Sequence, residues 1–122
     1  MSNAYELGLK TATFIVNAEL EDEQYYAVKM NSSEKIILAS TGDKMLGVLQ
    51  DAPDAANRTC LVAFGGITKA IGGDAISAGD KVEVTSAGKF VTQSTGVVVG
   101  WAVTPCGADD EQFSLLIDQT AS

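Results

Sequence analysis

The chain has 122 residues, enough for one ordinary domain with its own hydrophobic core. It is 46% hydrophobic and 20% charged, and no apolar run approaches the roughly 18 residues that a membrane-spanning helix needs, so no membrane partner is expected. Sixteen acids against eight bases give a net charge of −8, which argues against a nucleic-acid partner, and the lack of histidine removes the usual general base and the commonest transition-metal ligand.

The first ten residues, MSNAYELGLK, lack the basic and apolar regions of a signal peptide, so we expect synthesis in a cytoplasm. In this segment Tyr5, Leu7 and Leu9 alternate with other residues, which suits an extended strand added to the sheet edge of a partner. A frayed terminus is the alternative interpretation.

Short runs rich in Val, Ile, Thr, Phe and Tyr recur along the chain between clusters of Gly, Ser, Asn and Asp, which predicts an all-β fold. Pro53 and Pro105 each follow an expected strand, where the chain must leave the sheet. The segment ELEDEQ could form a helical turn. The expected strands are Thr11–Val16, Tyr25–Met30, Lys35–Ala39, Leu46–Gln50, Thr59–Phe64, Ile67–Ile71, Lys81–Thr85, Lys89–Gln93, Val97–Val103 and Gln112–Ile117.

An internal repeat relates two parts of the chain. The segment from Lys35 matches the segment from Lys89 at an offset of 54 (89 − 35), and one extra residue in the first copy then changes the offset to 53, which pairs Val48 with Trp101. In the last strand of each copy the alternate positions are apolar, which indicates one buried face. These positions are Cys60, Val62 and Phe64 in the first copy and Phe113, Leu115 and Ile117 in the second.

The repeat predicts a single compact β-barrel or sandwich built from two similar β modules, with an extended N-terminal arm. Residues 1–20 would form the arm and first strand, and residues 21–122 the β-barrel-like domain. Within this domain the repeat covers about 25–64 and 81–117. Such an arrangement also removes exposed sheet edges.

The segment AVKM, which contains Lys29, is close to the signature that presents a lysine for biotin attachment at the tip of a hairpin. The repeat instead places Lys29 within a strand, beside Glu83 or Thr85 depending on whether the offset is 54 or 56. A solvated strand lysine is therefore favoured over a biotinyl carrier.

Two other patterns resemble ligand sites. The glycines of GGITKAIGG bracket a β-type run instead of leading into a helix, so bends or hairpins are favoured over a phosphate loop. The acidic clusters ELEDE and DDE lack the spacing of a calcium loop, which favours solvated loop charge over a loose cation site or a salt bridge to a partner. We therefore expect no catalytic residue, no metal site and no cofactor.

Trp101 lies in the apolar run VVVGWAV, and its match to Val48 favours burial in the core, with an aromatic anchor at an interface as the alternative. Cys60 and Cys106 have no Cys or His at metal-ligand spacing, so we expect small buried apolar residues. Whether the two cysteines interact stays open.

From about Ala18 to Ile117 the chain resembles a family of tailed-phage capsid decoration, or cement, proteins. The resemblance is carried by AELEDEQYYAVKM, GVLQDAP and GGITKAIGGDAISAGDKVEV, and by VVVGWAV followed by a polar loop and FSLLI. The family usually has a glycine in the first-copy turn, as in Ala78-Gly79-Asp80 of the second copy. Here that turn reads Asp22-Glu23-Gln24, which puts its geometry in question.

The resemblance implies a small β-barrel-like virion protein, not an enzyme, that docks on the outer surface of the capsid and stabilises the head. Its partner would be the major capsid protein, and it would be a homo-oligomer, with a trimer favoured. The family commonly docks through an N-terminal arm, which makes Tyr5, Leu7 and Leu9 the candidate capsid-binding residues. The alternatives are another β-structured virion component, of tail or baseplate, or a biotinyl-like carrier domain.

Overall fold

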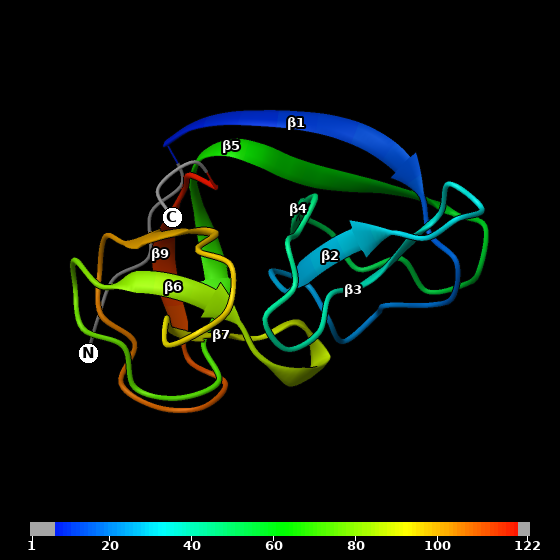
Figure 1. Ribbon diagram of the computed structural model, residues 1–122. Helices are drawn as coiled ribbons and strands as arrows, with labels where there is room; N and C mark the ends of the chain where they lie inside the picture. Colours follow the sequence, from blue (N-terminus) through cyan, green and yellow to red (C-terminus); the bar gives the residue numbers. More distant parts are fainter. Residues whose placement is uncertain (1–6, 120–122) are drawn as a thin grey trace.

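The structure is a computed structural model that describes residues 7–119, and within this range the chain is all-β, as predicted (Figure 1). Nine strands and one short 3-10 helix, η1 (Ser86–Gly88), occur in the described part. The strands are β1 (Leu7–Ile15), β2 (Ala27–Met30), β3 (Ile36–Leu38), β4 (Gly47–Leu49), β5 (Thr59–Ile71), β6 (Lys81–Val84), β7 (Phe90–Thr92), β8 (Gly100–Ala102) and β9 (Gln112–Ile117).

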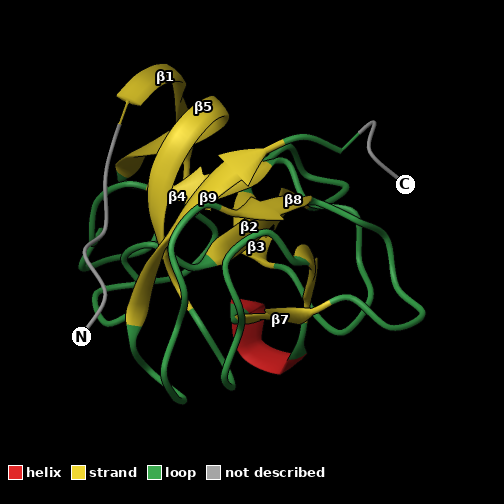
Figure 2. Cartoon of the chain, turned by 90° about the vertical axis from the view of Figure 1, so that its left-hand side faces the viewer, coloured by secondary structure: helices red, strands yellow, loops and turns green. Residues whose placement is uncertain are grey.

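All of these strands belong to one strongly curled sheet (Figures 1 and 2). The hydrogen-bonded order is β3-β2-β4-β5-β9-β8-β6-β7, and β1 pairs with β5 outside this path. In Figure 1 the β1 and β5 pair runs along the top, and β5 then turns down beside β9. The predicted barrel or sandwich is thus a half-barrel whose path ends at β3 and β7.

Strand β5 corrects the prediction of two strands separated by Gly65 and Gly66. The strand continues through both glycines, pairing with β1 from Thr59 and with β9 from Gly66 onward. Gly66 has a φ of 91°, and a Cβ atom there would lie 2.3 Å from the carbonyl oxygen of Gly8. Glycine therefore lets the strand bend without losing its pairing.

Strand β8 is shorter than the predicted run Val97–Val103. Before it, the amide of Val97 donates at 3.3 Å to Gly42 O in the first module, and the amide of Val99 donates at 2.9 Å to Val82 O of β6, the strand that pairs with β8. The apolar run thus begins as a connection between distant segments and becomes a strand only at Gly100.

Two sets of strands have the same pairing, which matches the repeat in the sequence. We call β2, β3, β4 and residues 59–64 of β5 the first module, and β6, β7, β8 and β9 the second module. Residues of β2 and β3 correspond to those of β6 and β7 at an offset of 54 (82 − 28), and residues of β4 and β5 to those of β8 and β9 at 53 (101 − 48). The cross-strand pair Val28–Leu38 of the first module corresponds to Val82–Thr92 of the second. The pair Val48–Ala63 likewise corresponds to Trp101–Leu116.

The sequence match of Ala78-Gly79-Asp80 to Asp22-Glu23-Gln24 in the first-copy turn is wrong by two residues. The residue equivalent to Gly79 is Tyr25, because the amides of both donate across the sheet at 2.7 Å, Gly79 to Ala102 O and Tyr25 to Leu49 O. Both residues have a left-handed backbone, with φ of 89° and 72°. The turn is therefore kept, although a tyrosine stands where the other copy has glycine.

The first module buries both faces of its sheet, because successive strand residues point to opposite sides and both sides are covered. On one side Val28 and Leu49 belong to a cluster that also contains Val16 and Leu20. On the other side Ala27 and Val48 belong to the larger cluster, which they share with residues of the second module. No strand face of this module remains for solvent at these positions.

The second module packs one face into the core, while its other face is accessible in part, with Leu116 exposed but Glu83 buried. Val82, Ala102 and Leu115 line the larger cluster, where Phe90 and Phe113 meet edge to face at 6.0 Å between ring centroids. The opposite face of the same strands is not part of either cluster. The modules therefore pack with one face of the first against the inner face of the second.

Candidate functional site

A row of side chains crosses the exposed face of the second module and continues onto β5 and β1. Directly paired residues of antiparallel strands place their side chains on the same face. Five strands about 4.8 Å apart give this row a length of about 20 Å. The row, called the outer row below, consists of Lys81, Trp101, Leu116, Ile67 and Leu7.

The outer row is accessible, and it is apolar except for the lysine at its end. Leu7 is 61% exposed and Leu116 38%, while Ile67 and Trp101 are half-buried. The Nζ atom of Lys81 lies 5.5 Å from the centroid of the Trp101 ring, within the range of a cation–π contact. The row thus joins apolar surface to a positive charge.

Trp101 is half-buried on the outer face, so burial in the core, which its match to Val48 favoured, is wrong. Alternation along β8 explains the placement, because Gly100 and Ala102 are buried and the residue between them points outward. Gly100 also permits close strand contact, since a Cβ atom there would lie 2.1 Å from Leu116 O. The exposed alternative could be recognised from this alternation, although the repeat pointed the other way.

The three predicted capsid-binding residues fall in different places. Tyr5 lies outside the described residues. Leu7 begins β1 and forms one end of the outer row. Leu9 is half-buried and lies in the irregular part of β1 between Leu7 and Lys10, where the pairing with β5 shifts. Their role in binding stays a prediction.

The polar turn of the first module lies at residues 40–43 and is held by its own aspartate. The carboxylate of Asp43 accepts hydrogen bonds from the Ser40 amide and hydroxyl at 2.9 and 3.1 Å, and the Lys29 amine lies 2.7 Å from it. The hydrogen bond from Lys29, followed by that from the Ser40 amide, lowers the pKa of Asp43. Lys29 is therefore a paired strand residue of β2, not a lysine presented at a hairpin tip.

The equivalent turn of the second module has no aspartate, and a buried glutamate takes the same part. Glu83 occupies the position equivalent to Lys29, and only 5% of it is exposed. Its Oε1 atom accepts the amides of Ser94, Thr95 and Gly96 at 2.5, 3.3 and 3.4 Å. These hydrogen bonds, above all that from Ser94, lower the pKa of Glu83 despite its burial.

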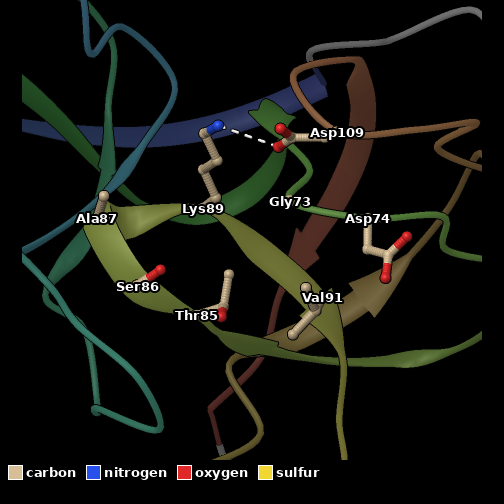
Figure 3. Close-up of a pocket in the computed structure, with 8 residues that line it drawn as sticks. All are labelled: Gly73, Asp74, Thr85, Ser86, Ala87, Lys89, Val91 and Asp109. Carbon is tan, nitrogen blue, oxygen red and sulfur yellow. Dashed lines mark hydrogen bonds and ion pairs between the residues drawn. The ribbon is translucent and has the colours of Figure 1, made fainter.

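A pocket of about 390 Å³ lies beside η1 and β7 (Figure 3). Its one amine, on Lys89, lies 3.0 Å from Asp109 and 2.5 Å from Asp110, and these two hydrogen bonds raise its pKa. The acidic cluster DDE is thus partly an internal ion pair. The pocket is lined by Gly73, Asp74, Thr85, Ser86, Ala87, Lys89, Val91 and Asp109.

The remaining candidates from the sequence form no ligand site among residues 7–119. No group of three or more His, Cys, Asp or Glu in this range could hold a metal ion, and no helix in it could span a membrane. Cys60 and Cys106 are free and buried in different clusters. Burial raises the pKa of both thiols, that of Cys60 to about 11, so each resembles a small apolar core residue.

These residues define a class of protein: an all-β structural module whose polar side chains hold turns and whose accessible strand face is apolar. The chain belongs to the phage cement protein family, whose model matches residues 11–117. Membership confirms the family predicted from the sequence and makes the chain a structural protein associated with the phage head. It also points away from catalysis.

A solved structure has the same fold. It is the head fiber gp8.5 N base of bacteriophage phi29, which aligns with a TM-score of 0.69 and 17% sequence identity. The alignment covers 91% of this chain and 95% of the phi29 chain. No curated protein matches the sequence.

Proposed function

We propose that the protein binds the outer surface of the assembled phage head, in contact with the major capsid protein, and stabilises the head without catalysing a reaction. The observation that carries this proposal is the family match over residues 11–117. The arrangement of polar groups supports it, because the acids and lysines described above are engaged in turns and ion pairs.

The stabilisation needs no chemistry. A ligand that binds only the assembled lattice adds its binding free energy to that state by mass action. If the protein is a homo-oligomer, with a trimer favoured, each copy raises the effective concentration of the others at the lattice. Shells would then resist internal pressure through contacts across their seams.

The N-terminal residues Tyr5, Leu7 and Leu9 form part of the proposed contact. The described portion of this segment already pairs with β5 from Leu7 onward. Deleting residues 1–6 leaves β1 intact and removes Tyr5, so it tests the arm without cutting the sheet. A role in binding predicts weaker attachment of this variant to shells, and unchanged affinity removes residues 1–6, with Tyr5, from the mechanism.

The central test mixes purified protein with expanded shells that lack it. We expect saturable binding and a higher melting temperature of the decorated shells, measured by calorimetry. The absence of binding overturns the proposal. Imaging of virions that carry labelled protein separates a head location from the alternative location on the tail or baseplate.

A further inference from the structure

We infer that the outer row is the surface that docks on the partner protein, and that it takes an apolar patch flanked by carboxylates. The row consists of Leu7, Ile67, Leu116, Trp101 and Lys81. This inference rests on the proposed function, because it identifies the face through which the protein meets the shell.

The same backbone face is an interior contact in the first module. Lys81 and Trp101 are equivalent to Ala27 and Val48, whose exposure is 0% because they pack against the second module. The repeat therefore presents one kind of sheet face twice. In the first module this face is covered by the rest of the chain. In the second module it is accessible, and it carries larger apolar and basic side chains.

The charge on this face is opposite to that of the chain. The sequence has sixteen acids and eight bases, yet Glu83 is the one acid within the described strands, and it is buried. Lys81 ends the outer row, and Lys69 follows Ile67 by two positions on the same side of β5. Two lysines beside an apolar row are complementary to a partner surface with carboxylates around an apolar centre.

The rigid position of the row within the sheet also favours binding, because little conformational freedom is lost. Leu116 and Trp101 lie on β9 and β8, each hydrogen-bonded on both sides, so ordering them on binding costs little conformational entropy. A half-buried tryptophan next to the middle of such a row is the kind of residue that anchors interfaces.

The experiment compares Leu116→Asp with Met30→Asp in binding to undecorated shells. The two positions are matched, since Leu116 is 38% and Met30 39% exposed, but Met30 lies in β2 of the first module and outside the row. We expect Leu116→Asp to weaken binding about 30-fold or more and Met30→Asp to change it less than about twofold. Circular dichroism and melting temperature check that both fold, and Trp101→Ala provides a second variant of the row.

A second arm tests the charges. The double variant Lys69→Glu, Lys81→Glu is expected to weaken binding about tenfold at low salt, with a smaller difference at 0.5 M NaCl because exposed charges are screened.

The outcomes separate the two proposals. If the unaltered protein binds shells and the row variants bind equally well, the docking face is wrong and the proposed function stands. If the unaltered protein does not bind shells, both are overturned. If Leu116→Asp dissociates the free protein in sedimentation and leaves shell affinity per subunit unchanged, the row is a contact between copies, which also overturns the inference.

Discussion

The two modules share strand order and register but differ in how their faces and turns are filled. The first module buries both faces with small residues such as Ala27 and Val48, whereas the second carries Lys81 and Trp101 at the equivalent positions. One backbone arrangement therefore supports an interior layer in one copy and an accessible surface in the other. What separates them is the size and charge of side chains on one face.

The cores of the modules differ in the same way. The edge-to-face contact of Phe90 and Phe113 in the second module lies where the first has Ile36 and Cys60. The two cores therefore tolerate different volumes at equivalent strand positions, and each remains filled because its neighbours differ as well.

The largest expected difference between the modules is in the loss of stability when these core side chains are truncated. Phe113→Ala should lower the free energy of unfolding by about 3–5 kcal/mol, because it removes a fully buried ring and leaves a cavity. The equivalent Cys60→Ala should cost about 1 kcal/mol, since it deletes one sulfur atom. Urea denaturation of both variants measures the difference, and equal losses would show that the two positions contribute alike.

A smaller effect concerns the turns. Glu83→Gln should cost about 2 kcal/mol at pH 7, because a buried carboxylate accepts hydrogen bonds from the turn at 94–96. Asp43→Asn, its counterpart in the first module, should cost less than about 1 kcal/mol because that side chain is 30% exposed. Chemical denaturation of the two variants under identical conditions ranks them.

The pH dependence of the Glu83→Gln variant sharpens this result. Because the folded-state pKa of Glu83 lies below its ordinary value of 4.5, the carboxylate stabilises the fold fully above that pH. This stabilisation is lost as the pH falls through the folded-state pKa. The difference between the two proteins should therefore be constant near neutrality and shrink in acid, and a difference that grows in acid would contradict the assignment.

The smallest expected effect is a gain. Glu34 has a φ of 64°, and its equivalent in the second module is Gly88, with a φ of 80°. Glu34→Gly should raise the free energy of unfolding by about 0.5 kcal/mol, because glycine accepts this backbone without steric cost but loses more entropy on folding. Thermal unfolding measures the shift, and Ser33→Gly, one residue earlier in the same turn, is the control.

Much of the fold could be predicted from the sequence, because short β-branched runs and turn residues mark strands locally. The repeat was also recognisable from identical or similar residue types at fixed spacing in the sequence, and the strand registers have the same offsets of 54 and 53. The continuity of β5 could not be predicted, since glycine pairs mark a turn and a bend equally well. The left-handed backbone of Tyr25 could not be predicted, because tyrosine is a residue type that is common in strands.

The site was less predictable for a physical reason. The match of Trp101 to a buried valine is correct as a register, but burial depends on what packs against a face, and that is a property of the whole chain. The repeat likewise offered Glu83 or Thr85 as the equivalent of Lys29, and the strand registers select Glu83, yet its hydrogen bonds come from residues 94–96. Long-range contacts of this kind decide which strand face is accessible.

The position of Trp101 makes the protein its own optical reporter. It is the single tryptophan of the chain, half-buried in the outer row between Leu116 and Lys81 and close to the Lys81 amine. Its emission reports the environment of this face, so covering the face should shift the emission to shorter wavelength. A fluorine-labelled indole would likewise give one resonance for this face in the free protein and a displaced one when the face is covered.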